Sequence, residues 1–208
     1  QAEMSTMGLD ATTRRLLVET VARRVIDHAE DLTALDQAIG DGDHGFNMKR
    51  GFEAVLAKAD EFAGKPPSEA LQAVGMELVM KVGGASGPLY GSLFMGMAKA
   101  IGASTDRSSV MVAFDAGISD VEKRGKSSVG QKTMLDVLKP VADRLRSGGD
   151  IGAIRRTAAE AAAATVPMLA IRGRASFLKE RSVGHMDPGA RSSQLMIEAV
   201  CDFLEGKA

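Results

Sequence analysis

Apolar residues recur every three or four positions along most of this chain, which is the spacing of helices that bury one face. One such face is formed by Leu17, Val21, Val25, Ala29 and Leu32. Residues that favour strands are scarce, because only 4% of the chain is aromatic and Trp is absent, whereas Met occurs 12 times. The pattern therefore predicts an all-α fold.

The periodic segments predict about eight helices, and their short connections imply antiparallel neighbours in a bundle. We expect Asp10 to cap the first helix and Ser68 to cap the third, where Glu69 suits the helix dipole. The later helices are predicted over 88–103, 108–124, 131–146, 151–170 and 189–205. We identify no linker, and so predict one domain over residues 1–208, with residues 1–9 as a flexible N-terminal extension.

Charge and cysteine content exclude several classes of function. The 208 residues carry 26 Lys and Arg against 27 Asp and Glu, and this balance argues against broad capture of nucleic acid or anionic membrane. Cys201 is the single cysteine, so an internal disulfide is excluded. No apolar run reaches the ~20 residues that a membrane span needs, and the first ten residues lack a secretory signal. We expect a cytoplasmic protein with no nucleic-acid or membrane partner.

The chain has 23 glycines, many for a helical protein, since Gly weakens a helix interior by roughly 1 kcal/mol. We therefore expect the glycines to lie between helices. Many of them do gather in four polar connections, at 36–45, 83–88, 125–130 and 173–189. A purely structural connection needs one Gly or Pro, so these clusters are the candidate functional loops.

The first connection places Asp36, Asp41 and Asp43 within eight residues. Converging carboxylates repel each other, and a hard divalent cation such as Mg²⁺ or Ca²⁺ would remove that repulsion. A solvated acidic turn is the alternative, and spacing alone leaves both readings open. The Gly40-x-Gly42-x-x-Gly45 run matches the dinucleotide fingerprint only formally, because no strand precedes it.

The second connection, Gly83 to Pro88, directly precedes a predicted helix, so its backbone N–H groups suit phosphate oxygens. Taken alone, an ordinary helix–helix turn is the better explanation, and the candidate metal site is what favours phosphate binding. Arg174 in the last connection is a candidate phosphate ligand. His44 and His185 are candidates for acid–base chemistry or for structural hydrogen bonds. No Ser-His-Asp or Cys-His set is evident, which argues against a covalent hydrolase.

Five sequence blocks, taken together and in order, resemble the L subunit of dihydroxyacetone kinases. The resemblance extends from about residue 10 to residue 205. The blocks are Asp36-x4-Asp41-Gly-Asp43-His44-Gly45-x-Asn47-Met48, then Gly83-Gly84-Ala85-Ser86-Gly87-Pro88-Leu89-Tyr90-Gly91, then Gly130-Gln-Lys-Thr-Met134-Leu-Asp136, then Gly173-Arg174-Ala175-Ser176, then Gly184-His185-Met186-Asp187-Pro188-Gly189-Ala190.

The resemblance implies an eight-helix antiparallel barrel with an adenine nucleotide, ADP or ATP, bound in the loops at one end. It implies that Asp36, Asp41 and Asp43 hold two Mg²⁺ ions against the nucleotide phosphates, and that Phe46 contributes through its backbone. The nucleotide contacts that it implies are His44, Gly45, Phe46, Asn47, Ala85, Ser86, Gly125, Met134, Arg174, Met186, Asp187 and Pro188.

The implied activity is phosphoryl transfer to a short ketose that a separate K subunit holds covalently. The phosphoryl donor is either exchangeable ATP or a resident ADP that a phosphotransferase-system M subunit recharges, and the sequence does not separate these variants. A fatty-acid-kinase-type nucleotide domain and a nucleotide-sensing module that regulates a transcription factor are the alternatives. The ketose and the oligomeric state, including a homodimer, are left open.

Overall fold

The computed structural model describes residues 9–208, and helices account for all of the regular structure in that range. The elements in chain order are α1 (Ala11–Asp27), α2 (Ala29–Ile39), α3 (His44–Ala57), α4 (Ala59–Ala63), α5 (Pro67–Lys81), α6 (Ser86–Ala100), α7 (Arg107–Gly125), α8 (Leu135–Arg146), α9 (Ile151–Ala164), the 3-10 segment η1 (Arg174–Ser182) and α10 (Pro188–Leu204).

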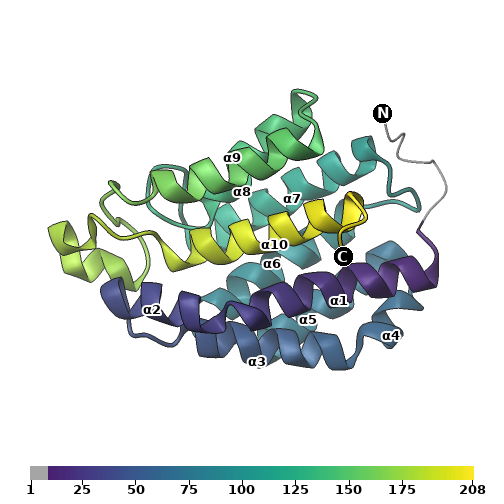
Figure 1. The fold of residues 1–208 in the computed structure, drawn as a ribbon, viewed down its shortest axis with the longest axis horizontal. Helices are drawn as coiled ribbons and strands as arrows, with labels where there is room; N and C mark the ends of the chain where they lie inside the picture. The colour runs from purple at the N-terminus through teal and green to yellow at the C-terminus, as the bar shows by residue number, and fades with distance from the viewer. Residues whose placement is uncertain (1–8) are drawn as a thin grey trace.

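The all-α prediction is confirmed, and the longer helices lie side by side with η1 next to α2 at one end of the molecule (Figure 1). The closed antiparallel barrel stays a prediction. None of the helices within residues 9–208 has the length and apolar character to cross a bilayer. The expected N-terminal extension falls almost wholly on residues 1–8, outside the described range.

The eight predicted helices become ten because two of them are each broken once. At His28 the backbone leaves the helical region with φ −105° and ψ 15°, and the ring Nδ1 lies 2.8 Å from the Arg24 carbonyl oxygen. The same conformation at Lys58 separates α3 from α4. The apolar periodicity continues across both breaks, so the sequence pattern does not reveal them.

The predicted helix cap at Asp10 is confirmed, and the one at Ser68 is not. The Asp10 and Asp150 carboxylates each accept a first-turn N–H at 2.7 Å, from Thr13 and Ala153. The prediction for Ser68 is wrong, because α5 already begins at Pro67. A proline suits the first helical position, where an N–H has no partner. The Ser68 hydroxyl instead donates to the Ala98 carbonyl oxygen at 2.7 Å and so joins α5 to α6.

Two helices are shorter than their periodicity predicts. α8 begins at Leu135 and not at 131, since Lys132 has a left-handed backbone (φ +63°). The Asp136 carboxylate stabilises this turn by accepting the N–H of Gly130 at 2.6 Å and of Thr133 at 2.8 Å. α9 ends at Ala164 and not at 170. Of the residues released before α8, Lys132, Thr133 and Met134 line the candidate site.

Several glycines lie inside helices, which contradicts the expectation that they lie between them. A Cβ on Gly75 of α5 would lie 2.7 Å from the Met95 Cγ atom of α6. A Cβ on Gly117 of α7 would lie 2.5 Å from the Leu93 carbonyl oxygen of α6. Such distances are too short for packed atoms. Glycine at these points therefore lets α6 approach both neighbours closely, and the main apolar core fills the space between the surrounding helices.

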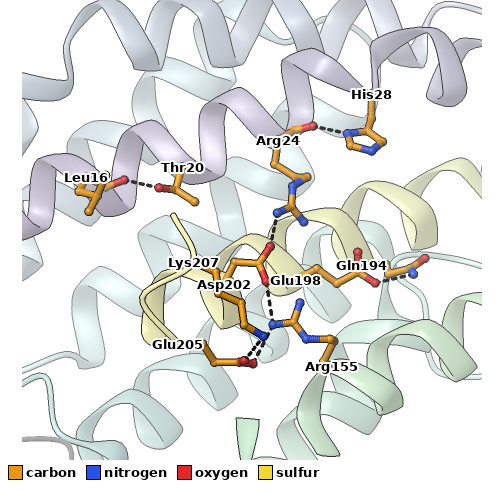
Figure 2. Close-up of polar contacts among 10 residues, drawn as sticks. All are labelled: Leu16, Thr20, Arg24, His28, Arg155, Gln194, Glu198, Asp202, Glu205 and Lys207. Atoms are coloured by element: carbon orange, nitrogen blue, oxygen red, sulfur yellow. Dashed lines mark hydrogen bonds and ion pairs between the residues drawn. The ribbon is translucent and has the colours of Figure 1, made fainter. Parts of the chain in front are cut away.

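An ion-pair network fastens the last helix to its neighbours (Figure 2). The Asp202 carboxylate of α10 pairs with Arg24 of α1 and, at 2.8 Å, with Arg155 of α9. Arg155 also pairs with Glu205 at 2.8 Å. The hydrogen bond from Arg24 and the pairing with Arg155 hold the pKa of Asp202 below its usual value. The network joins the first helix of the chain to its last two α-helices.

Candidate functional site

Five separate segments of the chain line one pocket. The pocket lies at the end of the molecule where η1 is found (Figure 1). The segments are the turn from α2 to α3, the residues before α6, those before α8, the start of η1 and the start of α10. The site residues predicted from the sequence that line it are Asp36, Asp41, Asp43, His44, Asn47, Ala85, Ser86, Met134, Arg174, Asp187 and Pro188. The fold therefore brings together loops from all along the chain.

The acidic side of the pocket is built on the last turn of α2. Asp36 is buried, and its Oδ2 atom accepts the backbone N–H of Asp43 at 2.9 Å and of His44 at 3.0 Å. These bonds fold the connection back, so that one carboxylate oxygen from each of Asp36, Asp41 and Asp43 lies within 4.8 Å of the others. The three carboxylates converge as the sequence predicts.

This convergence carries an electrostatic cost that a cation would relieve. Burial, together with the nearby Asp41 carboxylate, raises the pKa of Asp43. The Nε atom of Arg174, from η1, pairs with Asp41 Oδ2 at 2.8 Å and offsets part of the charge. An all-oxygen donor set suits Mg²⁺ or Ca²⁺ over softer metals. The donors and their spacing fit a hard divalent cation.

The second side of the pocket is the turn from Gly83 to Ser86, where α6 begins. Gly84 has φ +68°, and a Cβ on Gly83 would lie 2.8 Å from the Asn47 Oδ1 atom, so the turn packs closely on α3. The first N–H groups of a helix lack intrahelical partners and carry partial positive charge. A group able to bind anions therefore lies in the same pocket as the carboxylates.

His44 is buried between two hydroxyl groups. Its Nδ1 lies 3.0 Å from Ser86 Oγ, and its Nε2 lies 3.0 Å from Ser192 Oγ. Burial lowers the pKa of His44 to about 4, so the ring is neutral near pH 7. In this structure the ring makes structural hydrogen bonds, which was one of the two roles that the sequence left open.

Sequence reasoning missed the polar cluster behind His44. The buried Tyr90 hydroxyl donates to the Gly189 carbonyl oxygen at 3.2 Å and lies 2.5 Å from Ser192 Oγ and 2.9 Å from Ser193 Oγ. Burial raises the pKa of Tyr90 to about 12, which keeps the hydroxyl protonated. Adjacent serines on the buried face of a helix were the available signal. Lys132, Thr133 and Arg172 also line the pocket and were missed.

Four predicted nucleotide contacts lie outside the walls of this pocket as the described residues define them. Gly45 packs α3 on α2, since a Cβ there would lie 1.9 Å from the Ala29 carbonyl oxygen. Phe46 is 63% exposed. Gly125 ends α7, and Met186 packs on the smaller apolar cluster between α8, α9 and α10. The roles predicted for these four residues stay predictions.

The model of the DAK2 domain family matches residues 38–202, a span that includes every part of the pocket except Asp36. The chain belongs to the DAK2 family. Among relatives, the ADP-binding subunit DhaL of PEP-dependent dihydroxyacetone kinase 1 of Listeria innocua is 45% identical over 181 residues, covering 85% of this chain and 88% of the relative. DhaL of the PEP-dependent kinase of Escherichia coli is 43% identical, covering 82% and 86%.

The fold of this chain is also similar to that of a solved structure. The dihydroxyacetone kinase of C. freundii, in complex with AMP-PNP and Mg²⁺, superposes with a TM-score of 0.76 at 21% identity. The match covers 97% of this chain and 36% of the longer kinase chain. At that identity the match supports the fold, which agrees with the helices described above.

Proposed function

We propose that this chain is the nucleotide-binding subunit of a dihydroxyacetone-type kinase and passes a phosphoryl group to a ketose held on a separate K subunit. One observation carries the proposal: three converging carboxylates share a pocket with the residues at the start of α6. The relatives named as ADP-binding DhaL subunits support it. The proposal treats the chain as one nucleotide-binding domain that acts in the cytoplasm.

In this proposal different pocket residues bind the metal ions, the phosphates and the adenine ring of the nucleotide. Asp36, Asp41 and Asp43 hold two Mg²⁺ ions, whose positive charge offsets that of the phosphates. The N–H groups at Ala85 and Ser86 hold phosphate oxygens. Apolar side chains at the pocket wall suit the adenine ring, and they are Ile39, Leu89, Met134 and Pro188. The protein contributes position and charge, which is most of what phosphoryl transfer requires.

We propose a resident ADP as the phosphoryl carrier, recharged by a phosphotransferase-system M subunit. The two relatives above belong to kinases named as PEP-dependent, and this favours recharging over free exchange with ATP. Donation from exchangeable ATP is the alternative.

The test is reconstitution with a K subunit and a short ketose. Phosphoenolpyruvate with the M subunit and its phosphate carriers should support ketose phosphorylation, whereas ATP alone should not. ADP should also co-purify with the chain and resist exchange. Turnover with ATP alone would overturn the resident-ADP part of the proposal. Failure of the chain to bind either nucleotide in the presence of Mg²⁺ would overturn the proposal as a whole.

A further inference from the structure

Lys132 lies in the segment between α7 and α8 in a position unusual for a lysine. Its side chain is buried, with the residue 1% exposed, and its backbone has φ +63°. A residue other than glycine occupies that left-handed region at a cost of order 1 kcal/mol or more. Burying the ammonium adds a further cost, and burial lowers its pKa. Neither cost is explained by packing of the helices alone.

The ammonium group is surrounded by main-chain carbonyl oxygens. Lys132 Nζ lies 2.6 Å from the oxygen of Thr165, 3.3 Å from that of Val166, 3.2 Å from that of Met168 and 2.5 Å from that of His185. Three N–H donors are thus shared among four acceptors. The nearest opposite charges, on Asp136 and Asp187, act on it without direct contact.

These carbonyls belong to the segments that continue into the pocket walls. Residues 165–168 follow α9 and lead to Arg172 and Arg174, and His185 leads to Asp187. Lys132 itself is followed by Thr133 and Met134, which also line the pocket. One side chain therefore bonds to the chain that leads into two lining segments of the pocket, residues 172–175 and residues 187–189.

Few other hydrogen bonds tie these segments to one another. The Ile171 N–H donates to the Gln131 carbonyl oxygen at 3.3 Å, and the Asp187 N–H donates to Thr165 Oγ1 at 3.1 Å. The Gly184 N–H donates to the Val166 carbonyl oxygen at 2.8 Å. The Lys132 ammonium adds four contacts at the centre of this set, so its loss would leave the Met168 and His185 carbonyl oxygens without their N–H donor.

We propose that Lys132 is a positioning residue for nucleotide binding, whose buried ammonium holds the loops that carry Met134, Arg174 and Asp187 in their binding arrangement. The inference rests on the proposed function, since it concerns the same pocket. Holding loops in the bound arrangement before the ligand arrives reduces the ordering cost of binding. Lys132 acts through these loops, with its Nζ atom occupied by carbonyls.

The carbonyl cluster makes this role testable by chemical rescue. Lys132→Gly removes the side chain and keeps a residue that tolerates φ +63°. A cluster of carbonyl oxygens can replace the hydration shell of a small monovalent cation. Ammonium or propylammonium ions should therefore occupy the vacated position and restore the loop arrangement. Tetramethylammonium, which has no N–H group, should not.

The experiment is calorimetric titration of ADP at saturating Mg²⁺ into the full chain, after co-purified ADP has been removed by chelating Mg²⁺ and the metal has been restored. Lys132→Gly should bind ADP about 10- to 100-fold more weakly, the range typical for removal of a residue that orients a binding group. Added propylammonium should recover part of the loss. Lys126→Gly is the matched control, because Lys126 also has a left-handed backbone (φ +48°) but an exposed side chain, and its ADP affinity should not change.

The outcomes separate this inference from the proposed function. If the unmodified chain does not bind ADP with Mg²⁺, the proposed function fails. If the unmodified chain binds and Lys132→Gly binds equally well, the role of Lys132 is refuted while the function stands. A weaker affinity that no N–H cation restores also refutes it. Should Lys132→Gly fail to fold, Lys132→Met gives the test, because it keeps much of the side-chain length without an N–H donor, and an unchanged affinity there would overturn the proposal.

Discussion

The Nε atom of Arg174 lies 2.8 Å from the Oδ2 atom of Asp41, which joins η1 to the acidic turn between α2 and α3. The two residues are 133 positions apart in the sequence, and Asp41 is one of the three carboxylates of the candidate metal site. The Arg174 guanidinium therefore competes with a metal cation for the Asp41 carboxylate. The ion pair links the candidate metal site to η1, whose first residues also line the pocket.

Arg174→Ala should change the affinities for metal and nucleotide in opposite directions. Without the competing guanidinium, Mg²⁺ alone should bind as well as before or up to about fivefold more tightly, since an exposed ion pair contributes up to about 1 kcal/mol. ADP with Mg²⁺ should bind more weakly, because a phosphate contact is lost. Titration calorimetry measures both affinities. Arg181→Ala, in the same 3-10 segment, is the control, and parallel changes in both affinities would contradict the account.

Gly40→Ala should disturb the metal site through a single added methyl group. A Cβ at Gly40 would lie 2.1 Å from the Asp36 Oδ1 atom, so the carboxylate must move. We expect the Mg²⁺ affinity to fall about tenfold or more. Gly64→Ala is a matched control, because a Cβ there comes no closer than 3.6 Å to the Glu61 carbonyl oxygen. Unchanged Mg²⁺ binding in Gly40→Ala would exclude Asp36 as a ligand.

The buried neutral His44 should make folding stability depend on pH. Its pKa is about 4 in the folded state against 6.5 for a free histidine, so the unfolded chain binds more protons between these values. The contribution of His44 is therefore complete above pH 6.5 and is lost as the pH falls toward 4, by up to roughly 3 kcal/mol.

His44→Gln isolates this effect, which matters because Asp187, with its pKa raised to about 7, acts in the opposite direction over part of the same range. The free energy of unfolding from urea denaturation should fall more steeply below pH 6.5 in the unmodified chain than in His44→Gln. The two proteins share Asp187, so its contribution cancels in the difference. Parallel pH profiles would show that His44 is accessible to protons in the folded state.

The fold class and the polar loops could be predicted from local patterns, whereas contacts such as Met134 and Asp187 came only from the family resemblance. Apolar spacing predicts helices, and clustered glycines with Asp36, Asp41 and Asp43 predict the polar loops. The breaks at His28 and Lys58 have no such signal, since the apolar periodicity continues through them. The glycines inside helices, such as Gly75, were missed because close helix contact depends on which helices become neighbours.

Lys132 and Tyr90 are two further residues whose contacts could not be predicted from the sequence. Lys132 bonds to carbonyls 33 to 53 positions away, and the Tyr90 hydroxyl meets serines about 100 positions away. These contacts exist only after the chain has folded. Every residue has a main-chain carbonyl, so the amino-acid sequence does not show which carbonyls will accept a hydrogen bond from Lys132. The resemblance placed both residues inside matching blocks, but it gave neither of them a role.

The most direct test of the account is calorimetric titration of ADP, with and without Mg²⁺, into the chain and its Asp41→Ala variant, both first freed of co-purified ADP by chelating Mg²⁺. Asp41 is partly exposed and so can be removed without opening the core. The unmodified chain should bind ADP tightly only with Mg²⁺, and Asp41→Ala should lose about 100-fold or more of that affinity while keeping its helical circular dichroism. Asp27→Ala, an exposed acid at the end of α1, should bind like the unmodified chain. Equal Mg²⁺-dependent binding of ADP by Asp41→Ala and the unmodified chain would contradict the metal site on which the account depends.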